Sequence, residues 1–192
     1  MSETTNDWKT ELRQHPERAV PDRAGEFLAQ GQIAHVGFVE DGRPYVIPML
    51  YQYSPQSPDR LYLHSGFSSR TLLRLAEGIP VCVTVTMLDG LVYSRDAKYH
   101  SANYRSVMCF GRGRIVEDEQ VKRAMFEAMT TRYFPGRTAG HDYAPAPSSH
   151  LATTSVVEVV IEEISAKMRE GGPKGPQDAQ DDAPGTCGVM EV

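Results

Sequence analysis

Seven short runs of β-branched, aromatic and other apolar residues, separated by turn-forming residues, dominate this chain of 192 residues. Such runs are typical of β-strands, and the Asp41–Gly42 pair between the first two predicts a tight hairpin. The Asp89–Gly90 pair predicts a second turn in the same way. Strands joined like this form a small antiparallel barrel or sandwich rather than a sheet that alternates with helices. The seven runs are Gln32–Val39, Arg43–Tyr53, Arg60–His64, Pro80–Met87, Leu91–Ser94, Asn103–Val116 and Ala152–Met168.

Three other segments have helical signals. A short helix is expected between Pro21 and Gly31, and a second over Arg70–Glu77. Apolar residues of Glu117–Phe134 recur at helical spacing, which predicts the longest helix. We therefore expect one domain over residues 24–168, preceded by an extension of residues 1–23 and followed by an extended tail of residues 169–192.

The charge balance argues against a polyanion-binding surface. Twenty basic and 25 acidic residues give a net charge of −5, so we expect no nucleic-acid partner. Between Arg60 and Arg114, however, eight basic residues face only three acidic ones, for a local charge of +5. This imbalance suggests a local anion site, although the same residues can be the solvated flanks of strands.

Secretion, membrane insertion and metal binding find no support in the sequence. No apolar run approaches the ~18 residues of a membrane span, and Met1–Arg23 lacks the apolar core of a secretory signal. The three cysteines include no C-x-x-C pair, and the six histidines lack metal-ligand spacing. We expect a cytoplasmic protein with no membrane partner and no metal site.

One stretch has the composition of a phosphate-binding element. After the strand that ends at His64, the small residues of Ser65–Ser69 lead into a predicted helix that begins at Arg70. Hydroxyl groups, main-chain N–H groups and a guanidinium would converge there on an anion. The alternative is an ordinary helix N-cap with a solvated arginine beside it.

Three segments in this order resemble the FMN-binding split-barrel superfamily, which includes the pyridoxamine 5′-phosphate oxidases. They are His64-Ser-Gly-Phe-Ser-Ser-Arg70 between a strand and a helix, Ile79-Pro-Val-Cys-Val-Thr-Val85, and Asn103-Tyr-Arg-Ser-Val-Met-Cys-Phe-Gly111. Together with His64 and the late Ser165-Ala-Lys167, they are most similar to the flavin-nucleotide-binding branch that contains the nitroimidazole-resistance (Nim) proteins. The similarity extends from about Ala24 to Lys167.

The resemblance implies a mainly β fold, a six-stranded antiparallel split β-barrel, in a homodimer that binds FMN at the subunit interface. It implies that the barrel domain is an FMN-binding domain and that the protein is an FMN-dependent oxidoreductase acting on a small organic molecule, with a nitro-aromatic compound as the most concrete candidate. A non-catalytic flavin- or haem-binding module and an F420-dependent reductase stay open as alternatives.

The same resemblance assigns roles to individual residues. It implies that the second strand lines the flavin ring and that the third strand closes over it. It also implies that the start of the Arg70–Glu77 helix holds the phosphate and that a later strand contributes further contacts. His64 and Lys167 would lie on the substrate side as catalytic residues. The alternatives are a His64 satisfied by a neighbouring carbonyl and a solvated Lys167. The implied cofactor-binding residues are Ile47, Pro48, Met49, Leu50, Leu63, His64, Ser69, Arg70, Thr71, Tyr104, Arg105 and Ser106.

Two departures from the family pattern bear on function. The oxidases commonly have Ser-Arg-Lys in the phosphate-binding element, whereas this chain has Ser69-Arg70-Thr71 and so one cation fewer. True pyridoxamine oxidases also have a tryptophan- and arginine-containing substrate segment near their end, whereas the only tryptophan here is Trp8. Pyridoxine 5′-phosphate is therefore not the expected substrate.

Overall fold

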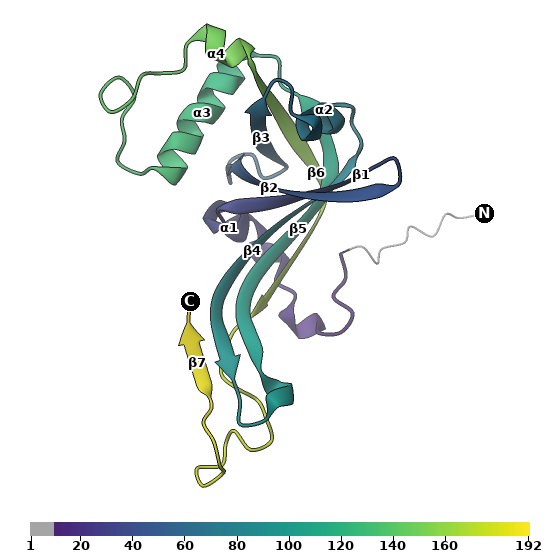
Figure 1. Ribbon diagram of the computed structural model, residues 1–192, viewed down its shortest axis with the longest axis vertical. Coiled ribbons are helices and arrows are strands. Elements are labelled where there is room, and N and C mark those ends of the chain that lie inside the picture. The colour runs from purple at the N-terminus through teal and green to yellow at the C-terminus, as the bar shows by residue number, and fades with distance from the viewer. Residues whose placement is uncertain (1–9) are drawn as a thin grey trace, which may run out of the picture.

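A closed ring of six antiparallel strands forms the centre of the molecule (Figure 1). The computed structural model describes residues 10–192. The ring has the order β1-β2-β3-β6-β5-β4, and a second pairing of β1 with β4 closes it. This confirms the predicted six-stranded antiparallel architecture. The strands are β1 (Ile33–Glu40), β2 (Arg43–Tyr53), β3 (Arg60–Gly66), β4 (Pro80–Tyr93), β5 (Ser101–Ile115) and β6 (Thr154–Arg169).

The predicted turn at Asp89–Gly90 is wrong, because β4 continues through it from Pro80 to Tyr93. The two residues form an irregularity in the pairing with β5, where the register shifts between Leu88 and Gly90. A hairpin would fold the following residues back onto β4, but here they keep β5 as their partner. Continued pairing with β5 therefore overrides the local turn preference of Asp-Gly.

The tail ends in a seventh strand outside the ring. Strand β7 (Gly188–Glu191) pairs with Gly90–Tyr93 of β4. It lies on the same edge of β4 as β1, which pairs with residues 82–85. Asp178 anchors the tail, because its carboxylate accepts hydrogen bonds from the Ser94 hydroxyl at 2.9 Å and the Arg95 N–H at 2.9 Å. The tail that the sequence predicts to be extended therefore returns to the sheet, and we call residues 170–191 the strap.

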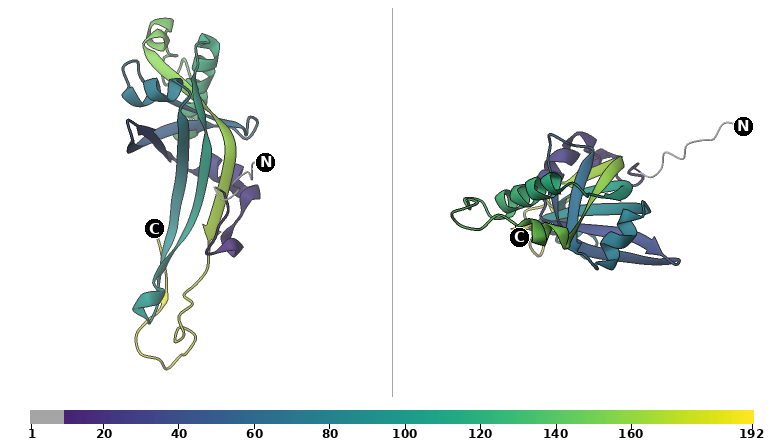
Figure 2. Two further views of the ribbon diagram at one scale, coloured as in Figure 1. Left: turned by 90° about the vertical axis from the view of Figure 1, so that its right-hand side faces the viewer. Right: turned by 90° about the horizontal axis from the view of Figure 1, so that it is seen from above.

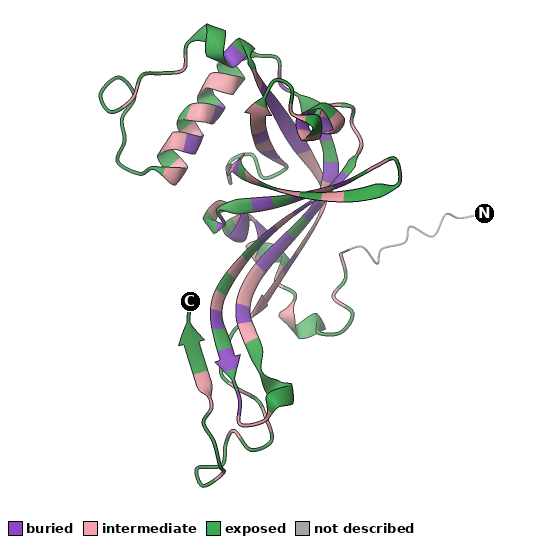
Figure 3. Ribbon diagram, in the orientation of Figure 1, coloured by how far each residue is buried: buried purple, intermediate pink, exposed green. Residues whose placement is uncertain are grey.

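The core lies inside the ring, and Figure 3 shows where buried residues fall along its strands. In Figure 1, α2 (Arg70–Ala76) lies above β1 and β2 and α1 (Ala24–Gln30) below them. Leu72 and Leu75 of α2, and Phe27 and Leu28 of α1, are fully buried in this core. The two short helices therefore cover the core from opposite sides.

The remaining helices pack outside the ring. Helices α3 (Glu119–Tyr133) and α4 (Ser148–Ala152) lie at one end of the molecule, and β4, β5 and β6 extend away from them toward the tail (Figure 2). Met125 and Met129 of α3 are buried against Val116 and Val156 in a second, smaller core. Over residues 10–192, no helix combines the length and the apolar character needed to cross a membrane. Short 3-10 turns complete the list: η2 (Pro16–Arg18), η3 (Pro21–Arg23) and η4 (Ala97–Tyr99).

We predict that Gly111→Ala destabilises the fold. Gly111 lies where the β5–β6 register shifts, and a Cβ there would stand 1.9 Å from the main-chain oxygen of Val160. The main chain would have to move, which should lower the free energy of unfolding by at least about 2 kcal/mol. Urea denaturation measures this, and Gly172→Ala, which would meet no atom within 4 Å, is the control. Equal stability of the two variants would contradict the close packing at Gly111.

Candidate functional site

The predicted phosphate-binding residues lie at the rim of the ring, at the start of α2. The hydroxyl of Ser69 caps the helix by accepting from the Leu72 N–H at 3.5 Å. Arg70 Cζ stands 4.4 Å from the ring centre of Tyr45, and its side chain is 59% exposed. Glu40 stands 3.4 Å from Arg70 and 3.1 Å from Arg74. Arg74 is also paired with Glu77. The exposure of its own side chain therefore leaves the Arg70 guanidinium accessible beside the hydroxyl groups of α2.

Strand alternation divides the predicted ring-lining residues into two sets. Pro48 and Leu50 point outward and are exposed, whereas the side chains of Ile47 and Met49 pack against the core. Leu63 of β3 also points inward and is fully buried. The side chains of Ile47, Met49 and Leu63 therefore support the outer surface from behind, and only their main chain can meet a ligand there.

His64 lies on the outward side of β3, under helix α3. Its ring makes an edge-on contact with Phe126, with 4.9 Å between ring centres. Within residues 10–192, its buried Nδ1 has no hydrogen-bond partner, and the same holds for Oε1 of Gln52 on the neighbouring strand β2. Burial lowers the pKa of His64. The imidazole is thus neutral near pH 7 and has an unused nitrogen.

The outward side chains of β2, β1, β4, β5 and β6 form one continuous surface, which we call the outer face. The strand registers place Pro48 beside His35, His35 beside Thr84, and Thr84 beside Met108. A groove of about 550 Å³ crosses it and is lined almost entirely by apolar residues. Large apolar side chains are exposed on the outer face, among them Ile33, Val39, Val46, Leu50, Leu88 and Met108.

Tyr104, Ser106 and Lys167 lie on the same outer face but further round the ring. Ser106 pairs with Lys167 across β5 and β6, and Lys167 Nζ stands 5.6 Å from the ring centre of Tyr104. Counted the shorter way round the ring, through β3, two to three strand spacings separate this group from β2, roughly 10–14 Å along the sheet at ~4.8 Å per strand. Lys167 also lies seven residues beyond Val160, where the pairing of β6 with β3 ends. One chain therefore does not bring Pro48 and Arg70 together with Tyr104 and Lys167.

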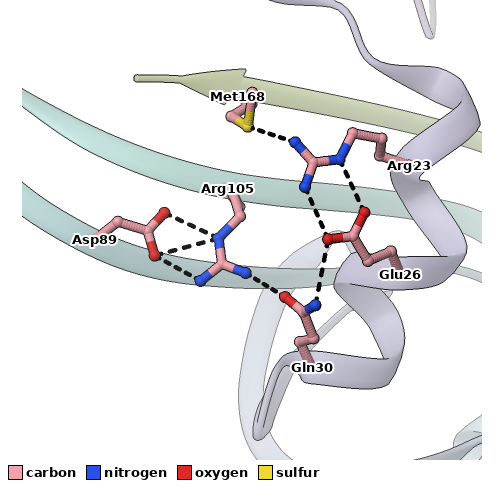
Figure 4. Close-up of polar contacts among 6 residues, drawn as sticks. All are labelled: Arg23, Glu26, Gln30, Asp89, Arg105 and Met168. Carbon is pink, nitrogen blue, oxygen red and sulfur yellow. Dashed lines mark hydrogen bonds and ion pairs between the residues drawn. The ribbon is translucent and has the colours of Figure 1, made fainter. Parts of the chain in front are cut away.

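Arg105 points to the opposite side, where α1 covers the sheet (Figure 4). It donates to both carboxylate oxygens of Asp89, at 2.6 and 3.0 Å, and to Oε1 of Gln30. These hydrogen bonds to the Asp89 carboxylate raise the pKa of Arg105. Arg105 is thus engaged in joining α1 to β4 and β5 and, in one chain, is turned away from Tyr104 and Ser106. The alternation of β5 was visible in the sequence and could have separated it from them.

Comparison with known proteins identifies the family of this chain. The profile of the family described as pyridoxamine 5′-phosphate oxidase matches residues 21–168. The chain belongs to this family. The resemblance inferred from its motifs is thereby confirmed, although a search among curated proteins gave no match.

Similar solved structures agree with this assignment. The FAD and haem binding protein from Mycobacterium smegmatis is 32% identical, with a TM-score of 0.80 over 91% of this chain and 84% of the other. The flavocytochrome Anf3 from Azotobacter vinelandii is 29% identical, with a TM-score of 0.82 over 95% of this chain and 83% of the other. A candidate 5-nitroimidazole antibiotic resistance protein from Bacteroides thetaiotaomicron is 26% identical, with a TM-score of 0.61 over 78% and 86%.

We predict that His64 makes the stability of the fold depend on pH. Its folded pKa lies below the ~6.5 of an unfolded histidine, so the unfolded chain binds the proton more tightly. Stability should fall as pH drops through ~6.5 toward the folded pKa and should level off below it. Between about pH 7.5 and 5.5, urea denaturation should show that the free energy of unfolding falls more for the wild type than for His64→Gln. Equal losses would show that the imidazole is not buried in its neutral form.

Proposed function

We propose that this protein binds a flavin nucleotide on its outer face and acts as a flavin-dependent oxidoreductase. One observation carries the proposal. Pro48, Leu50 and His64 share the outward side of β2 and β3, and Arg70 stands accessible at the rim beside the start of β2. An apolar strip that ends at a cation suits a flat aromatic ring carrying a phosphate. The similarity to proteins described as FAD-binding and as a flavocytochrome supports it.

The chain's residues divide the work of holding such a cofactor. Arg70 would hold the phosphate through charge-assisted hydrogen bonds, with the hydroxyl groups of Ser69 and Thr71 beside it. Pro48 and Leu50 would face the ring, and the neutral imidazole of His64 would lie at its edge, where it can hydrogen-bond to a substrate. The flavin supplies the electron-transfer chemistry, and the protein supplies position and exclusion of water.

Which flavin is bound is a separate question. The sequence resemblance implies FMN, whereas similar structures are described with FAD. Both molecules carry a phosphate on the ribityl chain, which is the group assigned to Arg70. Mass spectrometry of the cofactor released from the purified protein distinguishes FMN, FAD and F420, and an absence of any flavin would contradict the proposal.

The name of the family does not fix the substrate. The only tryptophan is Trp8, outside the described residues, and the segment where the oxidases carry their substrate residues here forms the strap and β7. We therefore propose a small organic substrate other than pyridoxine 5′-phosphate. The similarity to the Bacteroides protein makes nitro-aromatic reduction the first activity to assay.

A haem-binding role is the second candidate, and His64 favours it. Haem iron is commonly held by a neutral imidazole, and His64 is neutral near pH 7 with an unused ring nitrogen. Two of the similar structures are described as a haem-binding protein and a flavocytochrome. A Soret band in the purified protein that His64→Ala abolishes and His35→Ala keeps would establish it.

We further propose a homodimer in which the outer face is the interface. Exposed Val46 and Leu50 would be covered by the second copy, as contiguous apolar surface usually is. The partner would also bring its Tyr104 and Lys167 toward the Arg70 end of the first chain, which would complete the site that one chain leaves divided. The cytoplasmic location expected from the sequence stays a prediction.

We predict that Arg70→Ala selectively weakens the binding of phosphorylated flavins. Loss of a charge-assisted hydrogen bond of roughly 1.5–3 kcal/mol corresponds to a loss of about 10- to 150-fold in affinity. Riboflavin, which lacks the phosphate, should bind the variant and the wild type equally well. Arg43→Ala removes another exposed arginine near Tyr45 and should change neither affinity. If Arg70→Ala still prefers FMN to riboflavin as the wild type does, the phosphate lies elsewhere.

We predict that the protein is a dimer and that Val46→Glu separates it. Val46 is 63% exposed on the outer face, so a buried carboxylate would oppose association. Light scattering should give twice the chain mass for the wild type and one chain mass for the variant. Phe134→Glu, at an exposed position beyond α3, should remain dimeric. A wild-type protein that is monomeric at micromolar concentration would contradict both the interface and the shared site.

A further inference from the structure

The N-terminal segment encloses a second hollow, at the end of β5 and β6 that points away from α3. Residues before α1 follow the free edge of β6, where Val20 N–H donates to the Ala166 carbonyl at 2.9 Å and Ala19 pairs with Lys167. The Ser165 hydroxyl also donates to the Thr10 carbonyl at 3.0 Å. The hollow between this segment, η4 and the end of β6 has a volume of about 660 Å³. We call it the basic hollow.

Four positive side chains line the basic hollow, from segments far apart in the sequence: Arg18, Lys98, Arg169 and Lys174. Glu17 and Glu170 are the two acids in its lining. Glu17 is engaged by His15 at 3.0 Å and stands 3.9 Å from Arg18. Over residues 10–192, no ion pair joins Lys98, Arg169 or Lys174 to an acid. The hollow therefore has an excess of positive charge.

Arg169 is held in place by neutral groups. It donates to the side-chain oxygen of Asn103. It also donates to the carbonyls of Gly171 and Gly172, and each of these two distances is 3.1 Å. Burial and then the nearby charge of Arg18 lower the pKa of Arg169. A guanidinium fixed beside a like charge without a carboxylate is costly unless an anion offsets it. This arrangement is typical of a prepared anion site.

Aromatic rings adjoin the cations. Tyr99 lines the hollow and is 38% exposed, so a planar base can stack on it. A smaller hollow of about 270 Å³ shares His15 and Arg18 with the basic hollow and is lined by Tyr104 and Lys167. Positive surface thus runs from Lys174 to the residues that we assign to the flavin site.

We propose that the basic hollow binds the diphosphate of a nucleotide. Four cations match a group with two or more negative charges, and the volume admits more than an inorganic ion. The diphosphate can belong to a free nucleotide or to a bound FAD. In FAD, Arg70 of the second copy in the proposed dimer would hold the ribityl phosphate and the basic hollow would hold the adenylyl phosphate. The second source rests on the proposed flavin-binding function, whereas the first does not.

The test compares Lys98→Gln/Lys174→Gln with a control that removes two exposed charges elsewhere, Arg43→Gln/Arg137→Gln. Calorimetric titration of the full-length protein should show binding of ADP and pyrophosphate but not of adenosine. The first double variant should bind ADP at least about tenfold more weakly, because two charge-assisted contacts are lost. The control should bind ADP like the wild type, and equal weakening in both would overturn the site.

Flavin titrations then distinguish the two sources. If the diphosphate belongs to FAD, the Lys98→Gln/Lys174→Gln protein should bind FAD at least about tenfold more weakly and FMN unchanged, and ADP should compete with FAD. If it belongs to a free nucleotide, ADP should still bind the flavin-saturated protein and both flavins should bind the variant normally. Absence of binding by ADP and pyrophosphate, together with unchanged FAD affinity, would overturn the inference. Failure of both flavins to bind would contradict the proposed function alone, because the ADP titration still tests the hollow.

Discussion

The pairing of β1 with β4 is the contact on which the other features depend. Four residue pairs, from Ala34–Val85 to Gly37–Cys82, join the first strand to the fourth and turn a curved sheet into a ring. Once the ring is closed, each strand residue points either into the core or onto the outer surface. Fully buried Val36 and Val83 lie on the inner side of this seam. The outward residues His35 and Thr84 then become part of one surface that runs on to β2 and β5.

This division explains why the candidate site is spread over two places. Residues adjacent in sequence, such as Tyr104 and Arg105, face opposite sides of the sheet, and Arg105 contributes to the attachment of α1. Residues that share the outer face, such as Pro48 and Lys167, are kept apart by the strands between them. A second copy of the chain is the simplest way to unite them, which is why the dimer and the flavin site are proposed together.

The fold was predictable largely because its signals are local. The Asp41–Gly42 hairpin and the helical spacing in Glu117–Phe134 report on neighbouring residues, and both are found where the sequence places them. The Asp89–Gly90 pair has the same local signal, but pairing with β5 decides its conformation. The side-chain directions of Ile47 and Leu63 follow from alternation once the strands are known. The basic hollow was beyond prediction, because Arg18 and Arg169 meet only through the tertiary path of the N-terminal segment.

The strap that ends in β7 has a consequence for how this protein behaves among other proteins. Strand β4 is longer than β1, so the ring leaves the hydrogen-bonding groups beyond Val85 on that edge without a partner from β1. Unpaired strand edges are templates on which other chains add, and folded proteins usually cover or shorten them. The four residues of β7 pair with Gly90–Tyr93 and so cover this part of the edge. Strand β7 therefore protects this part of β4 from edge-to-edge pairing with other chains.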